Sequence, residues 1–175
     1  NKNEILAIVG ESGCGKSTLA TSIIGLHDHN VTRVEGEILY NNQNLATLKE
    51  SQFQSIRGSE IGMIFQDPLS ALNPLMKIGE QIEEALVYHT KLNKEQRKAR
   101  VLELLEQVGI PNPRLVYNQF PHQLSGGMRQ RVIIAIAISC KPQVIIADEP
   151  TTALDVTIQA QILDLLIDLQ AETGA

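Results

Sequence analysis

The sequence predicts an α/β fold with a mostly parallel sheet, a small antiparallel β subdomain and an inserted α-helical subdomain. Three observations predict it. Short apolar runs end just before Gly10, Gln66 and Asp148, as buried parallel strands do. A glycine-rich loop joins the first run to a segment with helical spacing, and helical periodicity dominates residues 73–121. The 175 residues are enough for one domain with a substantial core.

Four short runs predict the strands of this fold. They are residues 5–9, 37–40, 62–65 and 144–147. The first, third and fourth are continuous apolar runs, typical of parallel strands that are buried on both faces. The second precedes the turn-prone pair Asn41 and Asn42, which predicts a small antiparallel hairpin.

Apolar spacing and capping residues predict the helices. The segments are residues 18–24, 78–86, 93–109 and 125–140, with a last helix after Asp155. Asn93 and Gln96 have the spacing of a capping box, and Gly25 and Gly109 are typical helix ends. We therefore expect an α/β core of residues 1–72 and 122–175, with a helical subdomain of about residues 73–121 that extends to the glycine pair at 126 and 127.

Composition excludes several classes of protein. The net charge of −5 argues against a nonspecific nucleic-acid binder. The longest strongly apolar run, residues 132–138, is far shorter than the ~20 residues of a membrane span. No signal peptide is expected, because the chain opens Asn-Lys-Asn-Glu before a short apolar run. The two cysteines, Cys14 and Cys140, form no metal-type cluster, which fits a reducing cytoplasmic setting.

Residues 10–17, GESGCGKS, match the phosphate-binding P-loop pattern in full. Its glycines let backbone N–H groups surround a phosphate at a helix start, where Lys16 reaches the β- and γ-phosphates and Ser17 ligates Mg²⁺. The strand–loop–helix context disfavours a chance glycine-rich turn. The motif predicts a P-loop NTPase core that binds ATP and Mg²⁺. The expected ATP-binding residues are Gly10, Glu11, Ser12, Gly13, Cys14, Gly15, Lys16, Ser17 and Thr18.

Three polar residues at predicted strand ends complete the candidate site. We expect Asp148 to hold Mg²⁺ through water, and Glu149 to orient and polarise the attacking water as the catalytic base. The alternative is a pair of solvated acids, disfavoured because the preceding run is wholly apolar and Pro150 follows at once. Gln66 could contact Mg²⁺ or the attacking water. Taken alone, a glutamine at a strand end is more often polar surface.

A second phosphate-compatible motif, LSGGMRQ, occupies residues 124–130. Ser125 supplies a hydroxyl, while Gly126 and Gly127 expose backbone N–H groups at the start of a predicted helix. In isolation the same residues suit an ordinary helix N-cap followed by a flexible pair.

The order and spacing of these motifs resemble an ABC-transporter ATP-binding subunit over essentially the whole chain. The strings QDPLSALNP at 66–74 and DEPTTALDVT at 148–157 narrow the resemblance to the dipeptide, oligopeptide or nickel importer branch. The resemblance implies a head-to-tail dimer, in which one subunit's second glycine motif contacts the ATP on the other subunit's P-loop. The residues implied in that contact are Ser125, Gly126, Gly127 and Gln130.

Further implications concern partners and location. Asp155 is implied at the dimer interface, although a plain helix N-cap is an alternative and does not exclude it. The resemblance implies a related second ATPase subunit in a heteromer, two membrane permeases received by residues 67–121, and an extracytoplasmic solute-binding protein that acts indirectly. It implies a peripheral protein on the cytoplasmic face of the cell membrane, with no nucleic-acid partner.

Two elements of the resembling family have no match. No aromatic residue precedes Gly10 to stack on adenine, and no histidine follows His122 to contact the γ-phosphate. We therefore expect a fragment, truncated at both ends, that alone binds ATP weakly and hydrolyses it poorly. Alternatives are a DNA-repair or chromosome-maintenance ATPase, disfavoured by the lack of sustained heptads, a noncatalytic nucleotide sensor, and a small-molecule kinase, in which the second glycine motif would have no task.

Overall fold

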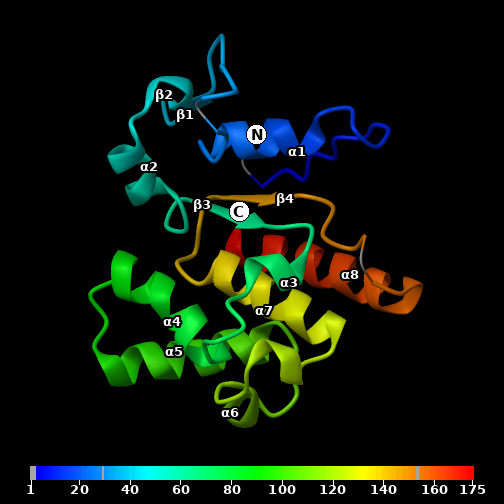
Figure 1. Cartoon of the computed structure of the whole chain (residues 1–175). Coiled ribbons are helices and arrows are strands. Elements are labelled where there is room, and N and C mark those ends of the chain that lie inside the picture. The colour runs from blue at the N-terminus through cyan, green and yellow to red at the C-terminus, as the bar shows by residue number, and fades with distance from the viewer. Residues whose placement is uncertain (1–2, 29, 153) are drawn as a thin grey trace.

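Two parallel strands form the centre of the molecule. The computed structural model describes residues 3–28, 30–152 and 154–175. Figure 1 shows β3 and β4 lying between helix α1 on one side and helices α3, α7 and α8 on the other, with α4, α5 and α6 beyond them. The helices are α1 (Lys16–Ile23), α2 (Glu50–Ile56), α3 (Pro68–Ala71), α4 (Ile78–His89), α5 (Lys94–Gln107), α6 (Pro113–Val116), α7 (Gly126–Ile138) and α8 (Val156–Thr173). The strands are β1 (Leu39–Tyr40), β2 (Gln43–Asn44), β3 (Ile61–Ile64) and β4 (Val144–Ala147), and the short 3₁₀ helices are η1 (Leu45–Thr47) and η2 (Pro121–Gln123).

Both predicted kinds of sheet are present. β3 and β4 pair in parallel, with Ile61 opposite Val144 and Ile64 opposite Ala147. A side chain at Gly62 would place its Cβ 2.4 Å from the Ala137 carbonyl oxygen, so the glycine lets α7 pack directly on β3. β1 and β2 form the predicted antiparallel hairpin. Asn41 and Asn42 have positive φ angles of 47° and 63°, which a tight two-residue hairpin turn requires.

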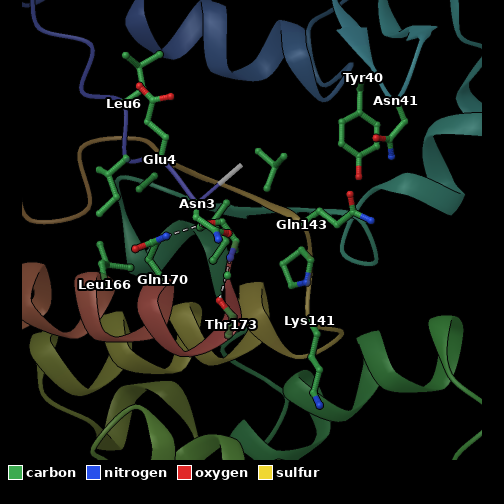
Figure 2. Close-up of a pocket in the computed structure, with 17 residues that line it drawn as sticks. Asn3, Glu4, Leu6, Tyr40, Asn41, Lys141, Gln143, Leu166, Gln170 and Thr173 are labelled. Atoms are coloured by element: carbon green, nitrogen blue, oxygen red, sulfur yellow. Dashed lines mark hydrogen bonds between the residues drawn. The ribbon is translucent and has the colours of Figure 1, made fainter. Parts of the chain in front are cut away.

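The strand predicted for residues 5–9 is wrong: the structure has no strand there. Ile5, Leu6 and Val9 are 61%, 77% and 92% exposed. An apolar run becomes a buried strand only when neighbouring strands and helices enclose it, and none of the described strands pairs with these residues. A cavity of about 610 Å³ separates the segment from β4 and the end of α8. Figure 2 shows Glu4 and Leu6 on one side of this cavity, with Leu166 and Gln170 on the other.

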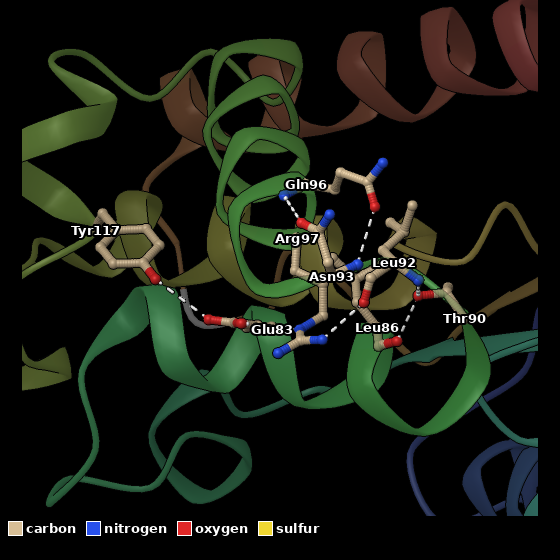
Figure 3. A network of polar contacts seen from close by, with 8 residues as sticks. All are labelled: Glu83, Leu86, Thr90, Leu92, Asn93, Gln96, Arg97 and Tyr117. Carbon is tan, nitrogen blue, oxygen red and sulfur yellow. Dashed lines mark hydrogen bonds and ion pairs between the residues drawn. The ribbon is translucent and has the colours of Figure 1, made fainter.

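The five predicted helices are present as α1, α4, α5, α7 and α8, whereas the shorter α2, α3 and α6 were not predicted. The Asn93 side chain accepts from the Gln96 backbone N–H, and the Gln96 side chain accepts in return, which confirms the capping box. A polar network joins α4 to α5 and α6 (Figure 3). In it Arg97 pairs with Glu83 at 2.9 Å, and the Tyr117 hydroxyl donates to Glu83 at 3.3 Å. Burial, followed by the Glu83 carboxylate, raises the pKa of Tyr117.

One large hydrophobic cluster crosses the predicted subdomain boundary. It includes Ile64 of β3, Ile82 of α4, Leu104 of α5, Ile134 of α7 and Ile162 of α8. The helical segment and the α7–α8 layer therefore share a core, and the division at residues 73–121 stays a prediction. A second, smaller cluster joins α1, η1, α2 and β3 and consists of Ile24, Leu45, Phe53, Ile56 and Ile61. Within the described ranges no helix combines the length and apolar character needed to cross a membrane.

Candidate nucleotide-binding site

The P-loop turns through backbone conformations that favour glycine. Gly13 and Gly15 have φ angles of 82° and 96°, and α1 begins at Lys16 directly after them, as predicted. A Cβ on Gly10 would lie 2.6 Å from Cys14 Sγ, so this glycine lets the loop fold back on itself. Lys16 Nζ donates to the carbonyl oxygens of Gly10 at 2.9 Å and Glu11 at 3.1 Å. The start of the loop thus holds the ammonium group at the end of the lysine side chain.

The paired strands bring the predicted polar residues to the same edge. Ile64 ends β3 opposite Ala147, which ends β4, and the Asp148 N–H donates to the Ile64 carbonyl at 3.0 Å. Gln66 therefore follows one strand where Asp148 and Glu149 follow the other. The carboxyl ends of neighbouring parallel strands are the usual place for a ligand in an open α/β sheet.

Two contacts join the P-loop to these strand ends, and a third joins the strand ends to each other. Ser17 Oγ donates to Asp148 Oδ1 at 3.0 Å. Lys16 Nζ forms an ion pair with Glu149 Oε1 at 3.4 Å, and Gln66 Nε2 donates to Glu149 Oε2 at 2.9 Å. Residues that lie more than eighty positions apart in the chain thus form one polar group at this edge, made of a Ser17–Asp148 pair and a Lys16–Glu149–Gln66 set.

Thr152 also belongs to this group, and it is not among the site residues predicted from the sequence. Its Oγ1 donates to Glu149 Oε2 at 3.1 Å, so both Thr152 and Gln66 hold the same carboxylate oxygen. Glu149 itself has a positive φ of 45°, which is uncommon for a residue with a side chain. A threonine three positions after a carboxylate is a usual spacing for such local contacts and was the available signal.

A small cavity opens beside these contacts. Its volume is about 200 Å³, and it is lined by Ser12, Gly13, Gly15, Lys16, Ser17, Thr18, Gln66 and Glu149. Of the predicted ATP-binding residues, Gly10 and Glu11 instead supply the carbonyls that hold Lys16, and Cys14 lies beside that lysine with Sγ 3.9 Å from Nζ. The larger cavity near β4 contains none of these P-loop residues among its lining.

The donor set fits Mg²⁺. This ion prefers oxygen ligands at about 2.0–2.1 Å in an octahedron, so adjacent ligand oxygens are separated by about 3 Å. Ser17 Oγ and Asp148 Oδ1 lie 3.0 Å apart. No group of three or more His, Cys, Asp or Glu side chains is placed to hold a metal in the described part of the chain. One or two protein oxygens together with water and phosphate is the usual arrangement for Mg²⁺.

The residue after Gln66 starts a short helix. Asp67 caps α3, with Oδ1 accepting from the Leu69 N–H at 2.9 Å and Oδ2 from the Ser70 hydroxyl at 2.9 Å. The Leu69 N–H and then the Ser70 hydroxyl hold the pKa of Asp67 below its ordinary value. The cap therefore fixes where α3 begins, immediately after the glutamine of the site.

The second glycine motif occupies the start of α7. Ser125 is the N-cap, and its Oγ accepts from the Met128 N–H at 3.3 Å, so the alternative interpretation as a helix cap holds, while contact with a second subunit's nucleotide stays a prediction. Ser125 and Gly126 are exposed. A Cβ on Gly127 would lie 2.9 Å from Ile158 Cγ2, which shows that this glycine also admits α8 close to α7. The cavity beside the P-loop has none of these three residues in its lining.

Two other implied contact residues have different surroundings. Gln130 is 1% exposed within α7, and this burial argues against the predicted direct contact with a nucleotide in a second subunit. The motif alone does not predict this burial. It depends on which face of α7 packs against the core, and Gln130 lies on that face. Asp155 is exposed and caps α8, with Oδ1 accepting from the Ile158 N–H at 3.0 Å. Ala153, in the string that carries the resemblance, lies outside the described residues.

Known proteins are similar to this chain in both sequence and fold. Residues 1–152 match the ABC transporter family. The chain is 62% identical to the oligopeptide transport ATP-binding protein OppD of Lactococcus lactis subsp. cremoris, over 99% of this chain and 52% of that protein. It is 50% identical to the dipeptide transport ATP-binding protein DppD of Escherichia coli, over 97% of this chain and 52% of that protein. The chain thus spans about half the length of the curated relatives it matches.

Solved structures with the same fold are also similar in sequence. One is a dimeric post-hydrolysis state of an ATP-binding cassette bound to ADP and Pi, with a TM-score of 0.86 and 35% identity over 99% of this chain and 72% of that chain. Another, from Clostridium perfringens, is described as part of an ABC transporter complex. Its TM-score is 0.80, with 30% identity over 99% of this chain and 64% of that chain.

Proposed function

Because the chain belongs to the ABC transporter family, we propose that it binds ATP with Mg²⁺ at the P-loop and hydrolyses it to power peptide import. The observation that carries this proposal is the polar group beside the 200 Å³ cavity. It contains a lysine for the phosphates, two oxygens suited to Mg²⁺, and a carboxylate held by Gln66 and Thr152. Those are the parts that transfer of a phosphoryl group to water requires.

Each residue has a defined task in this proposal. Lys16 leaves Glu149 and binds the β- and γ-phosphates, while the loop N–H groups surround them. Ser17 and Asp148 hold Mg²⁺, which when bound neutralises charge on the phosphate oxygens. Glu149 accepts the proton of the attacking water, and Gln66 and Thr152 hold that carboxylate in position.

We further propose that a second ATPase subunit completes the site. Ser125 and Gly126 are exposed at the start of a helix of thirteen residues, whose N-terminal end favours a phosphate. They are absent from the lining of the P-loop cavity in their own chain. A head-to-tail pair would let Ser125, Gly126 and Gly127 contact the nucleotide of the partner. A similar solved cassette is dimeric, which supports this arrangement.

The transported solute and the remaining partners are proposed for the full-length protein. The two relatives compared above are named as oligopeptide and dipeptide transport proteins, which favours peptides over nickel. We propose a heteromeric ATPase pair, peripheral on the cytoplasmic face of the membrane, with two permeases and an extracytoplasmic binding protein. Residues 67–121 would receive the permeases, and Leu69 and Leu75 in that region are 61% and 86% exposed.

Binding and turnover in the full-length protein test the ATPase proposal. With Mg²⁺, the native protein should bind a fluorescent ATP analogue and release phosphate from ATP. Lys16→Ala should lose most binding, whereas Lys94→Ala, which changes an exposed lysine at the start of α5, should bind normally. Equal binding by the two variants would contradict the assignment.

Uptake by cells tests the solute. Cells with Lys16→Ala in the chromosomal gene should lose ATP-dependent uptake of labelled peptides and keep their uptake of nickel ions. Loss of nickel uptake with normal peptide uptake would replace the proposed solute and leave the ATPase proposal intact.

A further inference from the structure

The Arg57 side chain contacts the backbone at the end of α1, the helix that follows the P-loop. Arg57 is the C-cap of α2, and its guanidinium donates from Nε to the Ile24 carbonyl at 2.7 Å and from Nη2 to the Gly25 carbonyl at 2.8 Å. These carbonyls follow the last turn of α1, the helix that begins with Lys16. A cation at the C-terminal end of a helix also complements the helix dipole.

The same guanidinium is fixed from its other sides. Its two Nη atoms pair with the two carboxylate oxygens of Glu50 at 2.5 and 3.0 Å, and its Cζ lies 4.8 Å from the centre of the Phe53 ring. A bidentate carboxylate and an aromatic face hold an arginine in one orientation. Arg57 is therefore a rigid connection between α2 and the end of α1, with its side chain 21% exposed.

The end of α1 is shaped to receive this connection. The Leu26 N–H donates to the Thr21 carbonyl at 2.8 Å, which terminates the helix in a Schellman-type turn. Gly25 has a φ of 64°, and a Cβ there would lie 2.4 Å from the Phe53 ring. Of the eight residues of α1, Ala20 alone is buried, so apolar burial contributes little to fixing the helix.

The backbone at Arg57 is joined to β3, the strand that leads to Gln66 of the nucleotide site. Arg57 forms a parallel bridge with Ile61, the first residue of β3. β3 runs on to Gln66 and pairs with β4, which leads to Asp148 and Glu149. The side chain thus holds the P-loop helix, while the backbone belongs to the segment that sets the position of the strand ends.

We propose that Arg57 is a positioning residue for nucleotide binding. It keeps α1 in place against the β3–β4 pair, so that the lysine and serine of the P-loop meet the polar residues at the strand ends. Arg57 touches neither the phosphates nor the reacting atoms. The inference rests on the proposed function only in that the bound ligand is ATP.

The helical subdomain offers a matched control in Arg97. Its side chain is also 21% exposed, pairs with Glu83 at 2.9 Å and donates to the Leu92 carbonyl at 2.7 Å (Figure 3). Arg97→Ala and Arg57→Ala each remove a carboxylate pair and a backbone carbonyl contact from different regions, although Arg57 makes more such contacts. Both should lower the denaturation midpoint of the full-length protein, while Arg57→Ala alone should weaken binding of a fluorescent ATP analogue, by about tenfold or more.

Conservative variants separate the contacts of Arg57. Arg57→Lys should restore binding only in part, because one ammonium group cannot serve both carbonyls and a bidentate carboxylate. Glu50→Gln should keep binding within about twofold of the native protein, since the carbonyl contacts with α1 remain. Hydrogen exchange without nucleotide gives an independent measurement: Arg57→Ala should speed exchange of the α1 amides and leave α4 and α5 unchanged.

The outcomes separate the two proposals. Native affinity and native α1 exchange in Arg57→Ala would overturn the positioning role, as would an equal loss of affinity in Arg97→Ala. If the native protein fails to bind the analogue, the proposed function fails. The exchange of the α1 amides still decides whether Arg57 holds that helix.

Discussion

Two parts of the molecule are stabilised in different ways. The helical part is α4, α5 and α6, and the nucleotide part is the P-loop with α1, α2 and the β3–β4 pair. Among the described residues, twenty buried apolar side chains form the cluster that fills the helical part and the α7–α8 layer. Five form the cluster that joins α1, α2 and β3. Before the P-loop, Ile5, Leu6, Ile8 and Val9 are all more than half exposed. Burial dominates one region, while polar contacts and backbone turns dominate the other.

Because of this difference, the residues that stabilise the fold and the residues of the nucleotide site lie in different regions. Buried apolar clusters resist local opening, whereas regions with few buried contacts open at lower free energy. The site residues belong to the second kind of region, and Lys16, Ser17, Gln66 and Glu149 are placed by polar contacts. A ligand that binds the folded site stabilises it by mass action. We therefore expect MgATP to reduce local opening around the P-loop more than around α4 and α5.

The largest expected effect is on chemistry alone. Glu149→Gln should lower ATP hydrolysis by about 10²–10⁴-fold, because the amide cannot accept the proton of the attacking water. The free energy of unfolding should change by only about 0.5 kcal/mol. Steady-state phosphate release and urea denaturation of the full-length protein measure the two quantities. Glu103→Gln, at a 65% exposed side chain of a surface pair, is the control, and near-normal turnover in Glu149→Gln would refute the assigned base.

A substitution in the core of the helical part should have the opposite effect, lowering stability and leaving nucleotide binding unchanged. Leu104→Ala should cost about 2–5 kcal/mol of unfolding free energy, because the side chain is fully buried and its removal leaves a cavity. The affinity of the folded fraction for nucleotide should stay unchanged. Leu75→Ala, at an 86% exposed residue, should cost about 0.5 kcal/mol or less. A loss of affinity in Leu104→Ala, measured where the protein is fully folded, would show that the two regions are coupled.

Two glycines sharpen the comparison within the nucleotide part. Gly25→Ala should cost about 1–3 kcal/mol, because φ is positive and the Phe53 ring occupies the place of the new Cβ. Gly13 also has a positive φ, but apart from its chain neighbours no atom of the described residues lies within 4 Å of its Cβ position, so Gly13→Ala should destabilise less. Gly13 lines the site, so its substitution should weaken nucleotide binding more than stability. Thermal denaturation and analogue titration distinguish the two variants, and equal destabilisation would contradict this account.

The smallest expected effect depends on pH. The pKa of Asp67 is lowered in the folded protein, so its cap of α3 stabilises the fold at pH values above its ordinary pKa of 3.8. That contribution is lost as the pH falls through the lowered, folded-state value. Asp67→Asn keeps an oxygen for the Leu69 N–H and should flatten this part of the pH dependence. Urea denaturation between neutral and acidic pH checks it, and identical pH profiles would exclude a role for the carboxylate charge.

Local rules predicted most of the site. A P-loop pattern specifies its own turn and the helix that starts at Lys16, and strand pairing then brings Gln66 beside Glu149. The capping box at Asn93 depends on nearest neighbours and was equally predictable. Local pattern was insufficient where distant segments decide: residues 5–9 are apolar, yet no described strand pairs with them.

Other features depend on which way a helix faces. Gln130 lies within a phosphate-compatible motif, but tertiary packing turns it into the core, where it is 1% exposed. Gly127 suits exposure of its N–H, and the approach of Ile158 adds a packing reason that no pattern in the sequence reveals. The contacts of Thr152 and Arg57 likewise depend on the folded chain, because residue type alone does not identify the hydrogen-bonded partners of either side chain.

The ion pair between Lys16 and Glu149 has a consequence for the cycle of binding and release. Because both side chains are attached to the same fold, the carboxylate is an internal competitor that stays at high effective concentration beside the ammonium group. If the chain binds ATP as proposed, the triphosphate must displace this carboxylate, which lowers the apparent affinity below that of an unopposed lysine. If the chain also hydrolyses ATP as proposed, the same carboxylate can pair with the lysine again after cleavage and thereby favour release of the product nucleotide.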